Sequence, residues 1–191
     1  LMSLKVLAVA LVALAVIYAG VWALGAAFWK ANTQDLWERI NASRSPVQKR
    51  TVDFQDLEGL PAPVQRYLRT VLVDGQPIVT QARMRQTGTF NMDEAGQRWK
   101  PFTAEQWVST CRPGFLWNAR ISMLPGLSAR VHDAYVAGDG VLHASLLGLI
   151  SVADQRGKGA LAEGELMRYF AEAAWYPTAL LPSQGVSWAP A

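Results

Sequence analysis

The stretch GFLWNARISMLPGLSARVHDAYVAGDGVL, residues 114–142, decides the fold of this chain. Residues on both sides of Leu124-Pro125-Gly126 alternate between apolar and polar side chains, and the second run ends at Gly138-Asp139-Gly140. A period of two is typical of β-strands, whose successive side chains point to opposite faces. Pro-Gly and Gly-Asp-Gly segments favour the tight turns that join antiparallel neighbours. The stretch therefore predicts two antiparallel strands and the start of another.

The same pattern extends outward in both directions. Upstream, residues 78–90 (IVTQARMRQTGTF) alternate, residues 93–96 form a turn, and a second extended run covers about 98–110, where Pro101 indicates an edge or a bulge. Downstream, residues 141–154 (VLHASLLGLISVAD) form a fifth extended run. Extended runs joined by short turns predict an antiparallel meander, which must bury one face under a cover.

Two segments have the helical period of 3.6 instead. ALAEGELMRYFAEAAW, residues 160–175, places Leu161, Leu166 and Tyr169 on one side, and we expect this helix to cover the sheet. LEGLPAPVQRYLRTVL, residues 57–72, predicts a shorter amphipathic helix. The fold class is therefore α+β, with a meander covered by one or two amphipathic helices.

The N-terminal part predicts a transmembrane helix. From Val6 to Trp29 the sequence VLAVALVALAVIYAGVWALGAAFW contains no charged residue. As a helix this segment would be about 36 Å long, enough to cross a hydrocarbon core of about 30 Å. The alternative is a cleaved signal peptide, since Ala23-Leu24-Gly25 or Gly25-Ala26-Ala27 offers small residues at a cleavage spacing. The apolar run is longer than the ~7 to 15 residues of a signal sequence, which favours an anchor.

Three regions follow from these patterns. Residues 1–29 form the membrane anchor, residues 30–56 a helical stalk and linker that Pro46 interrupts, and residues 57–191 the sheet domain. The chain starts at Leu1 and stops just after GVSW, residues 185–188, which has the pattern of a new strand. We therefore expect the sheet domain to be truncated at its C-terminus.

Charge and composition exclude several classes of protein. The net charge is +3, but residues 51–191 carry twelve basic and thirteen acidic residues, so the body lacks the basic patch of a nucleic-acid binder. Cys111 is the single cysteine and cannot form an intramolecular disulfide. His132 and His143 are the two histidines, without further ligands at metal-binding spacing. No metal and no cofactor is predicted.

Four motifs resemble an uncharacterised bacterial family of membrane-anchored envelope proteins, a domain of unknown function. They are PFTAEQ (101–106), PGFLWNARI (113–121), VHDAYVAGDGVL (131–142) and GELMRYFAEAAWYPTALLP (164–182), and the resemblance covers roughly residues 57–191. Cys111-Arg112 and Phe170 depart from that pattern mildly. The resemblance implies that the meander is a curved, half-barrel-like antiparallel sheet over a helix, similar to bacterial lipoprotein carriers, and that it binds a lipid-like or other apolar ligand. It implies no catalytic residue.

The side of the membrane on which the domain lies has two opposing indications. Five basic residues follow the span within the stalk and only Lys5 precedes it, which favours a cytoplasmic domain. Long domains are translocated largely regardless of flanking charge. Together with the resemblance, this makes a single-pass protein of the bacterial cytoplasmic membrane, with its domain on the extracytoplasmic side, the expectation.

Aromatic residues are the candidate ligand-binding residues, because large flat side chains line apolar pockets. The alternative is that they simply form the core. The six that we expect to line a pocket between sheet and helix are Trp107, Trp117, Tyr135, Tyr169, Phe170 and Trp175. Arg120, Arg130 and Arg168 are expected at its mouth, where a guanidinium can pair with an anionic headgroup; solvated or salt-bridged arginines are the alternative.

The sequence thus predicts a non-enzymatic, membrane-tethered protein whose partners are the lipid bilayer and a lipid-like ligand. One alternative is a scaffold that binds a protein through the open sheet edge. Another is an enzyme on a membrane substrate, for which Glu165 with Asp133 are the paired carboxylates and Cys111 a weak nucleophile candidate. The enzyme reading requires that two of five residues converge in a cleft. These are Glu105, His132, Asp133, Glu165 and Arg168.

Overall fold

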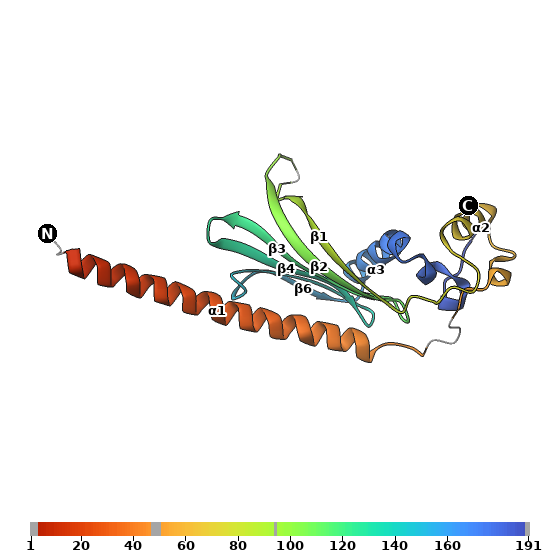
Figure 1. Ribbon diagram of the computed structural model, residues 1–191, viewed down its shortest axis with the longest axis horizontal. Coiled ribbons are helices and arrows are strands. Elements are labelled where there is room, and N and C mark those ends of the chain that lie inside the picture. The colour runs from red at the N-terminus through yellow and green to blue at the C-terminus, as the bar shows by residue number, and fades with distance from the viewer. Residues whose placement is uncertain (1–3, 47–50, 94, 190–191) are drawn as a thin grey trace.

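The computed structural model describes residues 4–46, 51–93 and 95–189. The described residues form a six-stranded antiparallel sheet with a helix on each face (Figure 1). The helices are α1 (Leu4–Ala42), α2 (Ala62–Val71) and α3 (Ala160–Glu172). The strands are β1 (Gln81–Asn91), β2 (Trp99–Ser109), β3 (Gly114–Leu124), β4 (Leu127–Val136), β5 (Asp139–Leu146) and β6 (Ile150–Gly157). The short 3-10 helices are η1 (Phe54–Leu57), η2 (Ala173–Trp175), η3 (Pro177–Leu180) and η4 (Pro182–Gln184).

The sheet is a meander, because its spatial order β1 to β6 is the order along the chain. It is curved and does not close into a barrel (Figure 1), so the α+β prediction of a curved antiparallel sheet is confirmed. The prediction of one extended run over 141–154 is wrong, because this run folds back on itself as β5 and β6. Leu147 and Gly148 both have positive φ, 55° and 80°, and Leu149 N–H donates to the Leu146 carbonyl at 3.1 Å. A leucine rarely adopts this conformation, so the composition did not mark the turn.

The prediction that the helix near 160–175 covers the sheet is confirmed by α3. Tyr169 is 1% exposed and packs with Phe115 and Val108 of the sheet in one buried cluster. Tyr176, just beyond η2, donates its hydroxyl hydrogen to the Tyr169 carbonyl at 2.9 Å. The same cluster includes Leu68 of α2, so one core joins the sheet to both short helices.

The other face of the sheet is covered by α1. Leu36 and Ile40 are 0% and 1% exposed and pack against Leu116, Ala134 and Val136 in a second buried cluster. The predicted stalk is helical from Lys30 to Ala42. This part of α1 packs along the sheet instead of projecting into solvent. The predicted break after Pro46 concerns residues 47–50, which lie outside the described residues.

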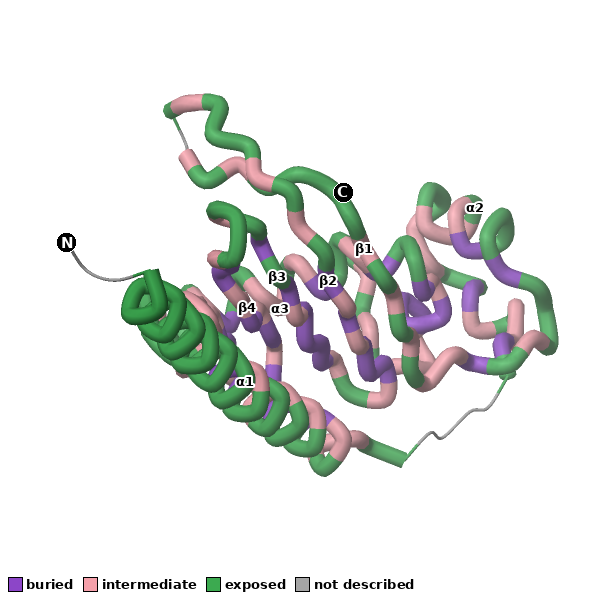
Figure 2. The backbone as a smooth tube through the Cα atoms, turned by 60° about the vertical axis from the view of Figure 1, so that its left-hand side comes forward, coloured by how far each residue is buried: buried purple, intermediate pink, exposed green. Residues whose placement is uncertain are grey.

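The first half of α1 has no contact of this kind and is exposed around its circumference (Figure 2). The helix first meets the sheet at the turns of two hairpins. The Tyr18 hydroxyl donates to the Gly126 carbonyl in the β3–β4 turn. At Gly25, an added Cβ would overlap the Leu147 carbonyl oxygen in the β5–β6 turn. We call this end of the sheet, with these two turns, the anchor end.

Candidate functional site

A row of polar side chains crosses the sheet beneath α1. The strand register aligns Glu105 with Asn118, Asn118 with His132, and His132 with His143. Because neighbours in register project to the same face, these four side chains lie side by side. A polar row at the interface with a helix needs partners on that helix.

Residues of α1 supply those partners one helical turn apart. The Trp29 ring stacks on the His132 ring, with centroids 3.8 Å apart, and its Nε1–H donates to Asn118 Oδ1 at 2.8 Å. Thr33 Oγ1 lies 2.8 Å from His132 Nε2, and Asn32 Nδ2 lies 3.4 Å from His143 Nδ1. These contacts fix the rotation of α1 on the sheet.

Burial keeps His132 neutral. Desolvation, followed by the nearby His143, Arg156 and Arg130, lowers the pKa of His132 to about 3. The Thr33 hydroxyl donates to the Trp29 carbonyl at 2.8 Å, so its oxygen accepts from His132 Nε2–H. The proton of the neutral ring therefore sits on Nε2, and Nδ1 is buried without a hydrogen-bond partner among the described residues.

Two adjoining cavities open between α1 and this face of the sheet, with volumes of about 420 and 370 Å³. They share Trp29, Glu105, Asn118 and Arg130. Trp37 and Trp107 line the first, and Arg120 lines the second towards the anchor end. We call this pair of cavities the α1 groove. Its volume suits part of a small or chain-like ligand.

Two arginines of the α1 groove have no carboxylate partner among the described residues. Arg120 and Arg130 are directly opposite each other on β3 and β4. Arg120 Nε donates to Ser128 Oγ at 3.2 Å, and Arg130 Nε is buried without a hydrogen-bond partner among the described residues. Burial, and then the charge of Arg120, lowers the pKa of Arg130. Like charges opposite each other destabilise a sheet unless an anion joins them.

Glu105, the acidic residue that lines both cavities of the groove, is already engaged. Arg83 Nη2 lies 3.0 Å and Arg85 Nε lies 3.1 Å from Glu105 Oε1. Burial alone would raise the pKa of Glu105, but hydrogen bonds from these two arginines hold it below its ordinary value. Glu105 is thus an ionised partner of β1 and leaves Arg120 and Arg130 unneutralised.

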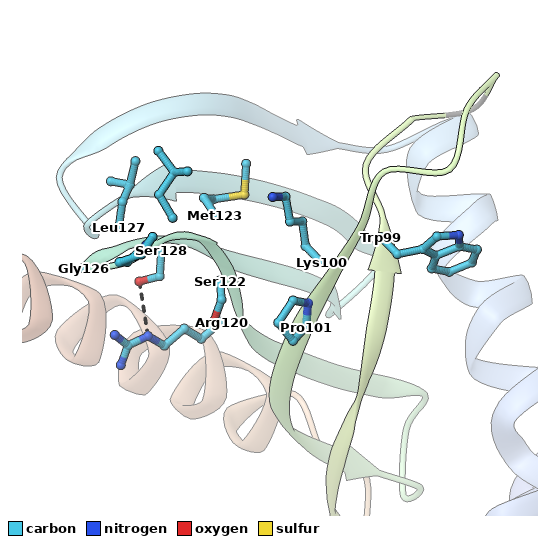
Figure 3. A pocket seen from close by; sticks show the side chains of 11 residues that line it. Trp99, Lys100, Pro101, Arg120, Ser122, Met123, Gly126, Leu127 and Ser128 are labelled. Carbon is cyan, nitrogen blue, oxygen red and sulfur yellow. Dashed lines mark hydrogen bonds between the residues drawn. The ribbon is translucent and has the colours of Figure 1, made fainter.

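A third cavity, of about 460 Å³, adjoins the groove at the anchor end. It lies where β2 separates from β3, since their pairing begins only at Phe102 and Ile121. Figure 3 shows Lys100 and Met123 on one side of this opening, and Arg120 reaching past Ser128 towards α1 on the other. Arg120 therefore lines both this cavity and the α1 groove.

The predicted ligand-lining aromatic residues are not brought together. Trp107 lines the α1 groove, whereas Trp117 and Tyr135 lie on the opposite face in the core beneath α3. Tyr169 is buried in that core, and Phe170 and Trp175 are 36% and 58% exposed. A pocket between the sheet and α3 stays a prediction, and the three cavities described above lie elsewhere.

The predicted headgroup-pairing arginines also differ. Arg120 and Arg130 lie at the groove without an acidic partner among the described residues. Arg168 pairs with Asp133, donates from Nε to Glu172 Oε1 at 2.9 Å, and lies over the rings of Phe115 and Trp117. Its charge is therefore satisfied within the fold.

Asp133, Glu165 and Arg168 converge, but the enzyme alternative required convergence in a cleft. Burial first, and then the hydrogen bond and charge of Asp133, raise the pKa of Glu165 to about 8. Loss of solvent and a neighbouring carboxyl group both disfavour the charged form of Glu165. The cluster is packed between α3 and the sheet, and none of the three cavities above includes it.

The other chemical candidates find no supporting geometry. Within the described residues there is no group of three side chains that could hold a metal ion. Cys111 is half-buried, accepts from Arg44 Nη2 at 3.4 Å and lies 3.8 Å from the Thr80 carbonyl oxygen. None of these neighbours is a base that would activate the thiol.

Sequence reasoning missed Trp29, Thr33 and Asn118 as site residues. The two in α1 carried a signal, because Trp29, Thr33, Leu36 and Ile40 follow the spacing of one helix face. The apolar span before them and the charged residues between them conceal that stripe.

The fold and site define a class of protein: a single long N-terminal helix, apolar in its first half, joined to an open six-stranded sheet with a basic groove under that helix. Residues 58–191 match the family of unknown function DUF6920, and the chain belongs to that family. The resemblance to a domain of unknown function is thus confirmed, whereas the likeness to lipoprotein carriers stays a prediction. No protein of curated function and no solved structure matches the chain.

Proposed function

We propose that this protein is a single-pass membrane protein that binds an anionic amphiphile in the α1 groove. Arg120 and Arg130 receive the anionic headgroup, and Trp29, Trp37 and Trp107 contact the apolar part. The observation that carries the proposal is the directly opposed arginine pair, without a described acidic partner, at the end of a tryptophan-lined groove.

The charges of the groove support an anionic ligand. Its basic lining residues are Lys30, Arg85, Arg120 and Arg130, and its acidic one is Glu105. Two guanidinium groups side by side can hold a phosphate or carboxylate through several charge-assisted hydrogen bonds. Binding would also relieve the repulsion between Arg120 and Arg130.

The first half of α1 supports the membrane tether. It is long and apolar enough to cross a membrane, and its most apolar 18-residue window is wholly unburied; a signal sequence has the same features. Both cleavage positions considered above lie inside α1, close to Gly25, which is buried against the β5–β6 turn. Cleavage there would remove Tyr18 and its bond to Gly126. An uncleaved helix retains these contacts.

Localisation in a bacterial envelope, with the domain on the extracytoplasmic side, remains part of this proposal. It is supported by the translocation of long domains regardless of flanking charge. Fusion of an alkaline phosphatase or a fluorescent reporter after residue 189 would distinguish the two sides.

The direct test measures lipid binding by the full chain purified from membranes. The probes are fluorescent phosphatidylglycerol and fluorescent phosphatidylcholine, which differ in headgroup charge. Loss of one charged hydrogen-bonding group should weaken phosphatidylglycerol binding by about tenfold in Arg120→Gln and in Arg130→Gln. Phosphatidylcholine binding should change little.

The matched control is Arg156→Gln on β6. Arg156 belongs to the same sheet face but pairs with Asp154 at 2.8 Å and lines none of the three cavities above. Equal effects of all three substitutions would mean that general surface charge, not the groove, attracts the lipid. Unchanged affinity in both groove variants would refute the proposal.

The open sheet favours a second candidate, a scaffold that binds a protein partner. β6 pairs only with β5, and most of its residues are exposed, so it presents an unpaired strand edge. Cross-linking in membranes from a cysteine at Gln155 would capture one stoichiometric protein if this candidate is correct. Arg120→Gln would not alter that capture.

A further inference from the structure

We infer that the β3–β4 and β5–β6 turns, with the residues beside them, are inserted into the bilayer next to α1. The inserted residues comprise 123–127 of the first hairpin and 147–150 of the second. We call them the hairpin tips. The membrane is then contacted by the sheet as well as by the helix.

The length of the apolar helix is the first argument. Tyr18, which bonds to the β3–β4 turn, lies only twelve residues after Val6, or about 18 Å along a helix. A hydrocarbon core of about 30 Å needs about 20 residues, which reaches Gly25 when counted from Val6. Gly25 is the residue that contacts the β5–β6 turn. A bilayer that covers the helix therefore reaches both tips.

The composition of the tips is the second argument. Residues 121–129 and 141–153 contain no Asp, Glu, Lys or Arg, and their one titratable side chain is His143. Leu124 is 64% exposed, and in the second tip Leu149 and Ile150 are 42% and 63% exposed. Turns at a protein surface are usually polar, so clustered exposed leucine and isoleucine at two adjacent turns indicate a nonaqueous contact.

A comparison of two turns of similar shape separates membrane contact from folding requirements. Ala137-Gly138, between β4 and β5, and Leu147-Gly148, between β5 and β6, each place a non-glycine residue and then a glycine at positive φ. The first is followed by Asp139 at the end of the sheet away from the tips. The second is flanked by Leu146 and Leu149 at the anchor end. The turn conformation alone does not require these leucines.

The third hairpin at this end behaves differently. The β1–β2 hairpin diverges from α1 (Figure 1), and its turn region carries Asp93 and Arg98. Charged residues thus occur at the turn that leaves the helix and are missing from the two turns that touch it. This hairpin serves as an internal reference for a solvent-exposed tip.

The backbone of the first tip is compatible with lipid. A carbonyl group exposed to hydrocarbon needs a hydrogen-bond donor, because no water is available there. The Tyr18 hydroxyl supplies that donor to Gly126. Arg120, between the tip and the Asn118–His132 row, is then at headgroup depth, where its charge is tolerated.

The experiment places single nitroxide labels on the full chain in phosphatidylcholine vesicles. Cys111→Ser removes the native thiol, and the labelled variants are Leu124→Cys and Ile150→Cys in the tips. The matched controls are Gln97→Cys in the β1–β2 turn and Ala137→Cys in the β4–β5 turn, both exposed. Spectra report collisions with oxygen, which concentrates in lipid, and with a water-soluble nickel complex.

The expected result is a severalfold higher ratio of oxygen to nickel collisions at positions 124 and 150 than at positions 97 and 137. Equal ratios at all four positions, in variants that retain the circular dichroism of the parent, would overturn the inference. The α1 groove does not enter this measurement, so its outcome is independent of lipid binding by Arg120 and Arg130.

Discussion

At the scale of single residues, two buried titratable groups make stability depend on pH in opposite directions. His132 binds its proton more weakly in the folded protein than in the unfolded chain, whereas Glu165 binds its proton more tightly. Both groups lie where a helix packs on the sheet. His132 contacts Thr33 of α1, and Glu165 of α3 interacts with Asp133 of β4.

Acidification is expected to weaken the packing of α1. The pKa of His132 is 6.5 in a free peptide and about 3 here, so the stabilisation is present above pH 6.5 and is lost as the pH falls towards 3. Thermal unfolding monitored by tryptophan fluorescence between pH 7 and 4 should show this loss. His132→Gln should have a lower midpoint but a flatter pH dependence. If the unfolding midpoints of the parent and of His132→Gln change equally with pH over this range, His132 is not the group responsible.

Alkaline conditions are expected to weaken the α3 side. Glu165 keeps its proton up to about pH 8 in the fold, whereas the unfolded chain releases it near 4.5, so stability falls as the pH rises from 4.5 to 8. Glu165→Gln retains a neutral side chain and should unfold at a higher temperature than the parent at pH 8.5, with little difference at pH 4.5. The control is Glu163→Gln, an exposed position on the same helix.

Residue types alone predicted part of the site. Arg120 was expected to meet an anionic headgroup, and the structure leaves it without an acidic partner at a groove, although beneath α1 and not beneath α3. Arg168 carries the same charge, but Asp133 and Glu172 neutralise it. Sequence spacing could not distinguish the two arginines, because the distinction depends on which strand neighbours lie in register.

At the scale of elements, the close contact between α1 and the β5–β6 turn depends on the absence of a side chain. An added Cβ at Gly25 would overlap the Leu147 carbonyl oxygen, whereas nothing lies within 4 Å of such an atom at Gly20. Gly25→Ala should therefore destabilise the protein by about 1–3 kcal/mol through forced displacement. Gly20→Ala should be neutral or stabilise the helix by up to about 1 kcal/mol.

Unfolding of both variants in detergent micelles, followed by circular dichroism, measures the difference. Comparable stability of the two would show that α1 does not press against that turn in solution. Loss of the contact should also raise proteolysis of the β5–β6 turn in Gly25→Ala relative to Gly20→Ala.

Element types followed from periodicity more reliably than element partners did. The alternating runs around Pro125-Gly126 became β3 and β4 because their turn residues are typical. The turn at Leu147 was missed because its apolar residues resemble a continuous buried strand. The contact of α1 with the sheet was missed because charged residues such as Asp35, Glu38 and Arg39 alternate with the buried stripe and suggest a solvated stalk.

At the scale of the whole molecule, α1 combines an exposed apolar first half with a second half that forms one layer of the domain. Its second half buries the cluster containing Leu116, Ala134 and Val141. Leu36→Ala and Ile40→Ala should each cost about 2–5 kcal/mol, as for other large-to-small substitutions in a core. Leu24→Ala, at an exposed position of the same helix, is the control and should have little effect in micelles.

Truncation tests the same dependence without a core substitution. A chain starting at residue 26 keeps Trp29, Leu36 and Ile40, and we expect it to be folded and monodisperse. A chain starting at residue 51 exposes the face formed by Leu116, Ala134 and Val136, and we expect it to aggregate. Size-exclusion chromatography separates the outcomes; a monomeric, cooperatively folded shorter chain would contradict this account.

The uninterrupted course of α1 from Leu4 to Ala42 has a mechanical consequence. A domain joined by a flexible linker samples a large volume and any orientation. A continuous helix packed along the sheet permits neither. If α1 stands upright in a bilayer, the domain keeps a constant height and a constant tilt relative to the lipid plane. Molecules that diffuse laterally in the same leaflet would then meet the same level of the domain at every encounter.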